Sequence, residues 1–243
     1  MRVPAVRATI ERRLLVNFRV DRDVLAAVLP APFLPHVVAG YGIGGICLIR
    51  LGAVRPAGVP ATLGVRSENA AHRIAVEWEA ADGPVTAVYI PRRDTSSRLA
   101  SVLGGRAFPG WQHRARFRVT EGEGSYRVEM SSHDARARVS VAAHLADDVM
   151  PGSVFGTLDE ASAFFRCAPC GYAATPADGV FDGVNLSTKG WGMAPLHLDE
   201  ARSSFFEDDG RFPPGSAVPD SAFVMAGLDT TWRPQPDLRV ATS

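Results

Sequence analysis

The sequence predicts a mainly β fold, a β-rich α+β protein in which a closed antiparallel β-barrel carries a few short helices. Many short apolar stretches are separated by turns that contain glycine and proline, and helix signals are few. The strands do not alternate with helices as they would in βαβ units. With 243 residues, of which 46% are hydrophobic, one domain over residues 1–243 is expected, with 235–243 as a frayed tail.

Alternating apolar residues and turn residues place the strands. Residues 7–19 show partial alternation, in which the apolar residues at even positions are Ala8, Ile10, Leu14, Val16 and Phe18. Further strands are expected at residues 36–39, 45–54, 72–78, 85–90, 115–120, 125–131, 136–144, 184–188, 193–198 and 222–228. Turns with glycine at 81–83 and 121–124 predict hairpins in the middle of the chain.

Three segments carry helix signals. The first has Asp21 as its N-cap and Pro30 as its stop, and the second runs from Thr95 to the glycines at 104–105. In the third, residues 157–160 have the Thr-x-x-Glu spacing of a capping box, which satisfies free backbone amides at a helix start.

Charge and cysteine content exclude broad classes of partner and location. The 26 basic and 26 acidic residues balance, so we expect no binding to nucleic acid or to an anionic membrane. Residues 24–49 lack charge, but Pro30, Pro32, Pro35 and four glycines interrupt this stretch, which argues against a membrane span. Three cysteines and a start without a signal-peptide pattern predict a cytoplasmic location.

Three motifs are explained by structure better than by chemistry. Residues 40–45 satisfy Gly-x-Gly-x-x-Gly, but a strand-like stretch follows instead of the helix that a dinucleotide site requires. Cys167 and Cys170 follow a predicted helix, so two half-buried thiols are the preferred interpretation and thiol redox work is an alternative. The six histidines lack metal-ligand spacing, and we expect neither a metal nor a cofactor.

The best functional candidates lie between residues 66 and 113. Glu68 and Arg73 flank the start of a predicted strand, where a carboxylate and a guanidinium can point into one cavity and hold an acid or enol. A surface ion pair at a strand edge is the alternative. The chain has 25 arginines but one lysine, Lys189, and no lysine lies in this segment.

The order of these features resembles the YqjF-like uncharacterised family of the acetoacetate decarboxylase-like superfamily. The resemblance covers nearly the whole chain and rests on residues 14–21, 29–30, 39–43, 68–69, Arg73, 104–106, Trp191 and 195–196. It implies a closed β-barrel with a central, partly apolar pocket for a small organic acid or carbonyl compound. Related barrels often assemble, which leaves a homo-oligomer open for this chain.

The sequence departs from the decarboxylases at their catalytic amine. Those enzymes carry a Schiff-base lysine just after a Gly-Arg turn, whereas residues 106–111 here read Arg-Ala-Phe-Pro-Gly-Trp. Glycine, tryptophan and arginine supply no primary amine at neutral pH, so decarboxylation by that mechanism is not expected.

The resemblance and the residue types together define the expected site. The catalytic candidates, for proton transfer or carboxylate binding, are Glu68, Arg106 and His113. The substrate-binding candidates are Arg73, Asn69, Trp111 and Lys189. The predicted function is binding of a small carboxylate or carbonyl metabolite, with cofactor-free acid–base chemistry of the lyase, isomerase or hydratase kind. The alternatives are a noncatalytic ligand-binding or protein-interaction barrel and a Schiff-base decarboxylase that uses Lys189.

Overall fold

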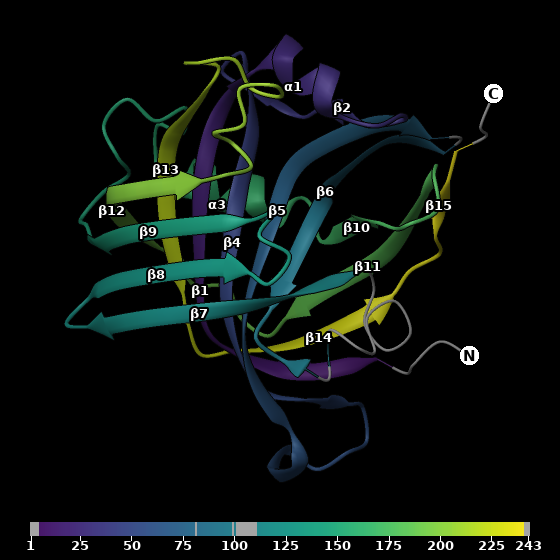
Figure 1. Ribbon diagram of the computed structural model, residues 1–243, viewed down its shortest axis with the longest axis vertical. Helices are drawn as coiled ribbons and strands as arrows, with labels where there is room; N and C mark the ends of the chain where they lie inside the picture. The colour runs from purple at the N-terminus through teal and green to yellow at the C-terminus, as the bar shows by residue number, and fades with distance from the viewer. Residues whose placement is uncertain (1–4, 81, 99, 101–110, 241–243) are drawn as a thin grey trace.

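The computed structural model describes residues 5–240, except 81, 99 and 101–110. The strands are β1 (Val6–Asp21), β2 (Leu34–Pro35), β3 (Val37–Val38), β4 (Tyr41–Pro56), β5 (Val65–Ala80), β6 (Gly83–Thr95), β7 (Gln112–Gly122), β8 (Ser125–Ser132), β9 (Arg138–Leu145), β10 (Cys170–Ala174), β11 (Val180–Thr188), β12 (Ala194–Ser203), β13 (Ala217–Met225), β14 (Leu228–Pro234) and β15 (Leu238–Arg239). The helices are α1 (Arg22–Val28), the short 3-10 helix η1 (Ala61–Leu63) and α3 (Leu158–Arg166). Strands dominate the molecule, which confirms the mainly β class (Figure 1).

The strands form one 15-stranded sheet of mixed direction, whose path runs β10-β11-β14-β1-β13-β12-β9-β8-β7-β6-β5-β4-β3. Two further pairings, of β1 with β4 and of β10 with β6, join strands that lie apart on this path. The pairs β10–β6 and β6–β7 are parallel, which corrects the expectation of a wholly antiparallel barrel.

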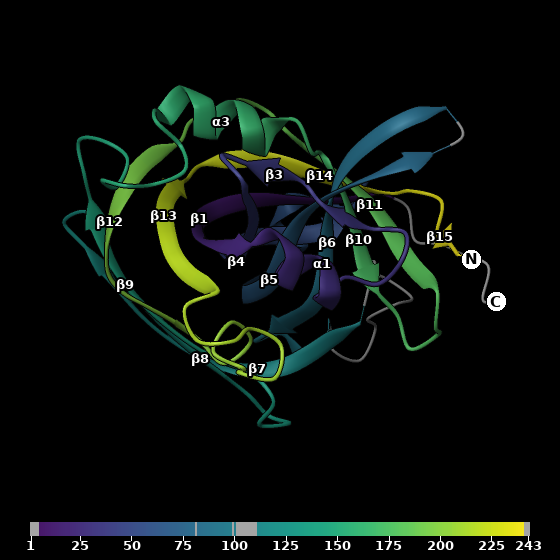
Figure 2. The same ribbon diagram turned by 90° about the horizontal axis from the view of Figure 1, so that it is seen from above.

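Four strands, β1, β4, β5 and β6, form a central wall that two rings of strands share. One edge of β1 pairs with β4, and its other edge pairs with β14 over residues 6–10 and with β13 over residues 13–20. At the far edge of the wall, β6 likewise pairs with both β10 and β7. One ring continues through β13, β12, β9, β8 and β7, and the other through β14, β11 and β10 (Figure 2).

The two faces of the central wall have different surroundings, because side chains alternate along a strand. On β5, Ala70, Ile74 and Val76 belong to the larger hydrophobic core, together with residues of β8, β9 and β12. Odd-numbered β5 residues such as Asn69 and Arg73 point to the opposite face, where they line a cavity. Helix α3 packs on this second face through a smaller hydrophobic cluster.

Both helix starts predicted for α1 and α3 are confirmed. Asp21 accepts hydrogen bonds from two backbone amides in the first turn of α1, at 2.9 and 3.2 Å. Thr157 accepts a hydrogen bond from the amide of Glu160 at 3.2 Å, and the Glu160 carboxylate accepts one from the amide of Gly156 at 2.8 Å. No helix within the described residues is long and apolar enough to cross a membrane.

The structure differs from the expected elements at several points. The sequence pattern predicts neither β10 nor β14, which are short and gain their partners from distant strands. Leu238 and Arg239 form β15 against β11, so the described part of the expected frayed tail is held by pairing. Of the helix expected from Thr95 to the glycines at 104–105, residues 99 and 101–105 lie outside the described residues. Thr95 itself ends β6, and helical backbone is found at Arg98 and Ala100. The glycines at 40–45 belong to a turn and to β4, as expected.

Candidate functional site

A cavity of about 540 Å³ lies on the second face of the central wall. Strands β4, β5, β6, β10 and β11 and the C-terminal end of α3 contribute its lining, most of which is apolar. Among the described residues, five arginines interrupt this apolar surface: Arg55 of β4 and Arg166 of α3, and also Arg13 of β1, Arg73 of β5 and Arg93 of β6. Sheet register places Arg73 and Arg93 close together. Arg73 pairs with Gly45 of β4, and Arg93 pairs with Ala71, which lies two residues before Arg73 on β5.

Arg13 and Arg73 approach each other near Cys47 of β4. The Nε atom of Arg13 donates a hydrogen bond to the Sγ atom of Cys47 at 3.0 Å. Arg73 is only 5% exposed. Burial, assisted by the positive charge of Arg13, lowers the pKa of Arg73 to about 10, although Cys47 opposes the shift. Neither guanidinium pairs with a carboxylate of the described residues. The two positive charges would therefore strongly stabilise an anion bound between them.

Two contacts hold Arg73 in place, and a glycine on β4 leaves room for it. It donates a hydrogen bond to Oδ1 of Asn17 on β1, and its guanidinium carbon lies 4.9 Å from the ring centroid of Phe165 on α3. Gly45 provides the space, because a Cβ there would lie 3.3 Å from Arg73 and 2.6 Å from the backbone oxygen of Val16. The Nε atom of Arg73 is buried and has no hydrogen-bond partner among the described residues.

Arg93 and Asn69 add further polar groups to the lining of the cavity. Burial lowers the pKa of Arg93 to about 10, while the charge of Asp182 opposes this shift. The amide nitrogen of Asn69 donates hydrogen bonds to the backbone oxygen and the hydroxyl of Ser67, at 3.2 and 3.0 Å. The carbonyl oxygen of Asn69 is therefore the atom that can accept a hydrogen bond from a ligand.

The cavity continues from the arginines to an apolar end. Along β4, the lining includes in turn Cys47, Ile49, Leu51 and Val54, and Val54 pairs with Val65 of β5, which also lines the cavity. At about 3.3 Å per residue, the step from Cys47 to Val54 covers about 20 Å. A ligand anchored at the arginines thus has apolar surface available along the length of β4.

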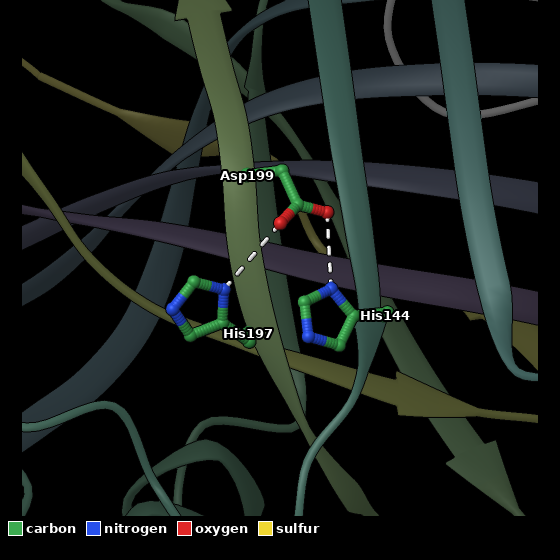
Figure 3. Close-up of side chains that lie close together, drawn as sticks. All are labelled: His144, His197 and Asp199. Atoms are coloured by element: carbon green, nitrogen blue, oxygen red, sulfur yellow. Dashed lines mark hydrogen bonds and ion pairs between the residues drawn. The ribbon is translucent and has the colours of Figure 1, made fainter.

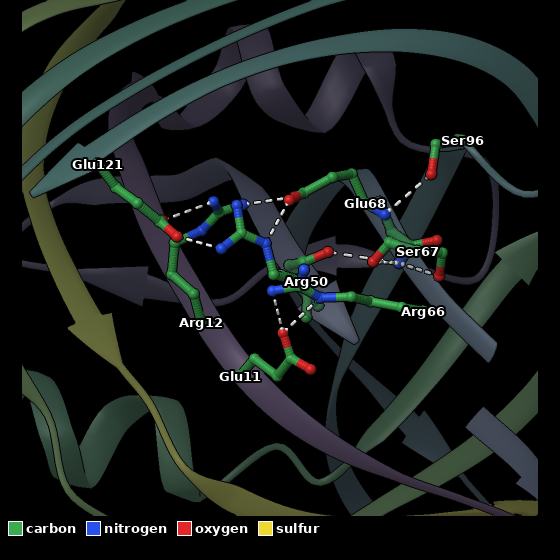
Figure 4. A network of polar contacts seen from close by, with 10 residues as sticks. Glu11, Arg12, Arg50, Arg66, Ser67, Glu68, Ser96 and Glu121 are labelled. Carbon is green, nitrogen blue, oxygen red and sulfur yellow. Dashed lines mark hydrogen bonds and ion pairs between the residues drawn. The ribbon is translucent and has the colours of Figure 1, made fainter. Parts of the chain in front are cut away.

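Glu68 lies on the opposite face of β5 from Arg73, which corrects the expectation that the two share a cavity. The Glu68 carboxylate accepts hydrogen bonds from Arg12 of β1 at 2.6 Å and from Arg50 of β4 at 2.5 Å. Glu121 of β7 contacts the same two arginines (Figure 4). Burial alone would lower the pKa of Arg50, but Glu68 and Glu121 raise it above its ordinary value.

Of the residues that the sequence proposed for the site, Asn69 and Arg73 line the cavity. Trp111 immediately precedes β7, is 55% exposed and lies outside the lining. Lys189 is exposed in the turn that follows β11, also outside the lining. Arg106 falls outside the described residues.

His113 belongs to a separate group of charges on β6, β7 and the turn after β8. Its Nδ1 atom lies 3.1 Å from a carboxylate oxygen of Asp134, which also contacts Arg92 at 2.9 Å. Burial, with the charge of Arg92, lowers the pKa of His113. Asp94 contacts Arg92 at 2.8 Å and is the member of this group that also lines the cavity. Burial raises the pKa of Asp94, against the influence of Arg92.

Cys167 and Cys170 are free thiols in the cavity lining. Cys170 is half-buried as expected, but Cys167 is exposed, which corrects the expectation for that residue. Cys167 is the C-cap of α3, and Cys170 is the first residue of β10. Neither thiol lies at a helix N-terminus, where the helix dipole favours a thiolate. This arrangement favours the interpretation of two structural thiols over the redox alternative.

His72 is buried in the larger core and is expected to make stability depend on pH. Its Nε2 atom lies 2.9 Å from the hydroxyl of Ser203, and burial, assisted by Arg92 and Arg211, lowers its pKa to about 3. The ordinary pKa is about 6.5, so the unfolded chain binds a proton first as the pH falls. We expect the free energy of unfolding to fall by about 1.4 kcal/mol for each pH unit below about pH 6.

Urea unfolding of the wild type and of His72→Gln at about pH 7, 6 and 5 measures this dependence. Glutamine does not titrate, so the variant should lose stability less steeply between the same pH values. Parallel curves for the two proteins would show that His72 does not cause the pH dependence.

Sequence reasoning missed three cavity residues, Arg13, Cys47 and Arg93. Arg13 and Cys47 carry a usable signal, because they fall on strand positions between apolar core residues and therefore belong to the other face. Parity along a strand marks a shared face, but only the register of neighbouring strands shows that these residues meet.

Comparisons with known proteins agree with this fold. A family model, DUF2071, described as an uncharacterized conserved protein, matches residues 7–221. No curated protein matches the sequence. An acetoacetate decarboxylase-like enzyme from Sphingomonas wittichii RW1 is a similar solved structure, with 12% identity, a TM-score of 0.59, and coverage of 99% of this chain and 94% of that chain.

Two further solved structures are similar in fold. Acetoacetate decarboxylase from Legionella pneumophila has 11% identity and a TM-score of 0.63, over 98% of this chain and 88% of that one. The enduracididine biosynthesis enzyme MppR, complexed with pyruvate, has 14% identity and a TM-score of 0.58, over 96% of this chain and 91% of that one. At such low identity these similarities establish the fold alone.

Proposed function

The chain belongs to the DUF2071 family of uncharacterized conserved proteins, and we propose that it binds a small organic acid in its cavity, with the carboxylate between Arg13 and Arg73. The observation that carries this proposal is the pair of guanidiniums in a mainly apolar cavity without a carboxylate partner among the described residues. Burying a cation without a counter-charge is costly, and an incoming carboxylate removes that cost while accepting charge-assisted hydrogen bonds. The pyruvate complex of MppR supports a carboxylate ligand at the level of the fold.

The size of the cavity favours an acid with an extended apolar body. Its volume of about 540 Å³ lies within the range of about 300–1,000 Å³ that is typical of pockets for drug-sized ligands. The apolar end along β4 offers burial to such a body while the carboxylate stays at the arginines. The ligand class is therefore a carboxylic or keto acid with an aliphatic or aromatic tail.

Calorimetric titration with straight-chain acids and 2-keto acids of increasing length, each beside its neutral amide, tests this proposal. We expect the acids to bind and their amides to bind more weakly, since an amide carries no charge for the arginines. Each added methylene should strengthen binding about threefold to fourfold, from about 0.8 kcal/mol per buried CH₂, until the cavity is filled. Equal affinity for acid and amide, or no binding by any acid, would contradict the proposal.

The Schiff-base alternative predicts a different result, which the single lysine makes easy to read. Lys189 is exposed and outside the cavity lining, so we expect borohydride reduction in the presence of keto acids to leave the protein unmodified once its N-terminus is blocked. Intact mass spectrometry measures this. A mass gain that disappears in Lys189→Arg would restore amine catalysis as the function.

Acid–base chemistry on the bound acid needs a proton-exchanging group beside the carboxylate, and the Cys47 thiol, which lines the cavity and contacts Arg13, is the candidate. Exchange of the protons next to the keto group in D₂O, followed by NMR, separates an enzyme from a binding protein. Exchange that is lost in Cys47→Ala supports catalysis. A ligand that returns unchanged supports the noncatalytic alternative.

A further inference from the structure

His144, His197 and Asp199 meet on the outer face of β9 and β12, outside the lining of the cavity (Figure 3). The two histidines are cross-strand partners, and their rings are stacked with centroids 5.0 Å apart. The Nδ1 atoms of both rings face the Asp199 carboxylate, at 3.0 Å for His144 and 3.6 Å for His197. Two imidazoles and one carboxylate thus converge, although their spacing in the sequence does not match a metal-binding motif.

A β-bulge places the carboxylate. Pairing between β12 and β9 shifts between Leu198 and Glu200, so Asp199 is an extra residue with no partner of its own on β9. Bulges re-aim a side chain and are over-represented next to functional sites. Here the extra residue lets one carboxylate reach the histidines of two strands.

We propose that His144, His197 and Asp199 bind one divalent transition-metal ion of the Zn²⁺ class. One ligand atom from each side chain already lies within 4.8 Å of the others. Metal–ligand distances of about 2.0–2.2 Å for imidazole nitrogen and carboxylate oxygen require only small side-chain movements from this arrangement. Neutral imidazole favours Zn²⁺, Ni²⁺ or Cu²⁺, whereas Mg²⁺ and Ca²⁺ prefer sites made of oxygen ligands.

Three protein ligands leave at least one coordination position open. All three side chains are about half exposed, so water or an external donor can reach the metal. Zn²⁺ sites with three protein ligands and one exchangeable position are the kind that support chemistry, whereas structural sites are closed by four. None of the three residues lines the organic-acid cavity, so the proposed metal site is independent of it.

Titration of the tag-free protein with Zn²⁺ alone, by calorimetry, tests the proposal, with Co²⁺ absorption as a second readout. We expect one equivalent to bind. His144→Ala and His197→Ala should each weaken binding about tenfold or more, since even the loss of an outer-shell partner of a metal ligand costs about 10–100-fold. His133→Ala removes an exposed histidine outside this group and should leave the affinity unchanged.

His144 and His197 are exposed, so their variants should unfold at the wild-type temperature when no metal is present. A protein that binds no Zn²⁺ would overturn the proposal. So would a double variant, His144→Ala with His197→Ala, that binds Zn²⁺ like the wild type. A thiolate-to-cobalt absorption band would move the metal to Cys167 and Cys170 and would equally overturn the assignment.

Discussion

Replacement of Arg73 by methionine is expected to weaken binding of an organic acid about 100-fold without lowering the stability of the protein. A hydrogen bond to a charged group contributes about 1.5–3 kcal/mol, and Arg73 lines the cavity, where its guanidinium can offer its charge and a donor to the carboxylate. Removing a buried cation that no carboxylate of the described residues neutralises stabilises the fold, and this gain offsets the loss of the hydrogen bond from Arg73 to Asn17. Methionine of similar length removes the cost of burying that cation.

Calorimetry and urea unfolding of the same preparation measure the two effects separately. Arg166→Met is the matched control, because Arg166 also lines the cavity but is exposed and lies over the ring of Trp191. It should bind the acid nearly as well as the wild type. Arg73→Lys should give an intermediate affinity, since an ammonium keeps the charge and loses the planar pair of donors. Undiminished binding by Arg73→Met would place the carboxylate elsewhere.

Replacement of Glu68 by glutamine should produce the opposite combination, a large loss of stability with binding retained. Arg12 is 3% exposed and would face Arg50 with only Glu121 to balance both charges. Removing one partner of a buried ion pair costs about 3–5 kcal/mol, and we expect about 3 kcal/mol because the side chain of Glu68 keeps 17% exposure. Denaturant unfolding measures the loss.

An exposed ion pair on the same strands supplies the control. Glu11 and Arg66 lie 2.7 Å apart, and the Arg66 side chain is 63% exposed, so Arg66→Ala should cost about 0–1 kcal/mol. Adding Arg12→Met to Glu68→Gln should recover part of the stability, because it removes the cation left without a partner. If Glu68→Gln stays as stable as the wild type but no longer binds the acid, Glu68 acts in the cavity after all.

The fold class and the starts of α1 and α3 follow from local signals in the sequence. Alternation over short range predicts strands, and the N-cap residues Asp21 and Thr157 need only their own neighbours to act. β10 escaped prediction because its five residues owe their conformation to pairing with β6 and β11. Strand pairing between distant segments carries no comparable local pattern.

The candidate site could be predicted in part. Arg73 and Asn69 line the cavity, and their polar side chains within an apolar strand are what drew attention to them in the sequence. Glu68 does not line it, because it lies five positions from Arg73, an odd separation that puts the two on opposite faces. The partners of Glu68 are Arg12 and Arg50, and Arg12 lies 56 residues away in the chain. No sequence pattern encodes that meeting.

The shared central wall also bears on how relatives of this chain can diverge. Along the middle of β4 and β5, residues of the packed core alternate with residues that line the ligand cavity. Substitutions at cavity positions such as Ala71 of β5 or Ile49 of β4 can therefore reshape ligand preference while the core behind them keeps its packing. Insertion of a single residue in β5 would exchange the two sets at once. Such a family is expected to tolerate varied ligands through point substitutions and to reject changes of strand length.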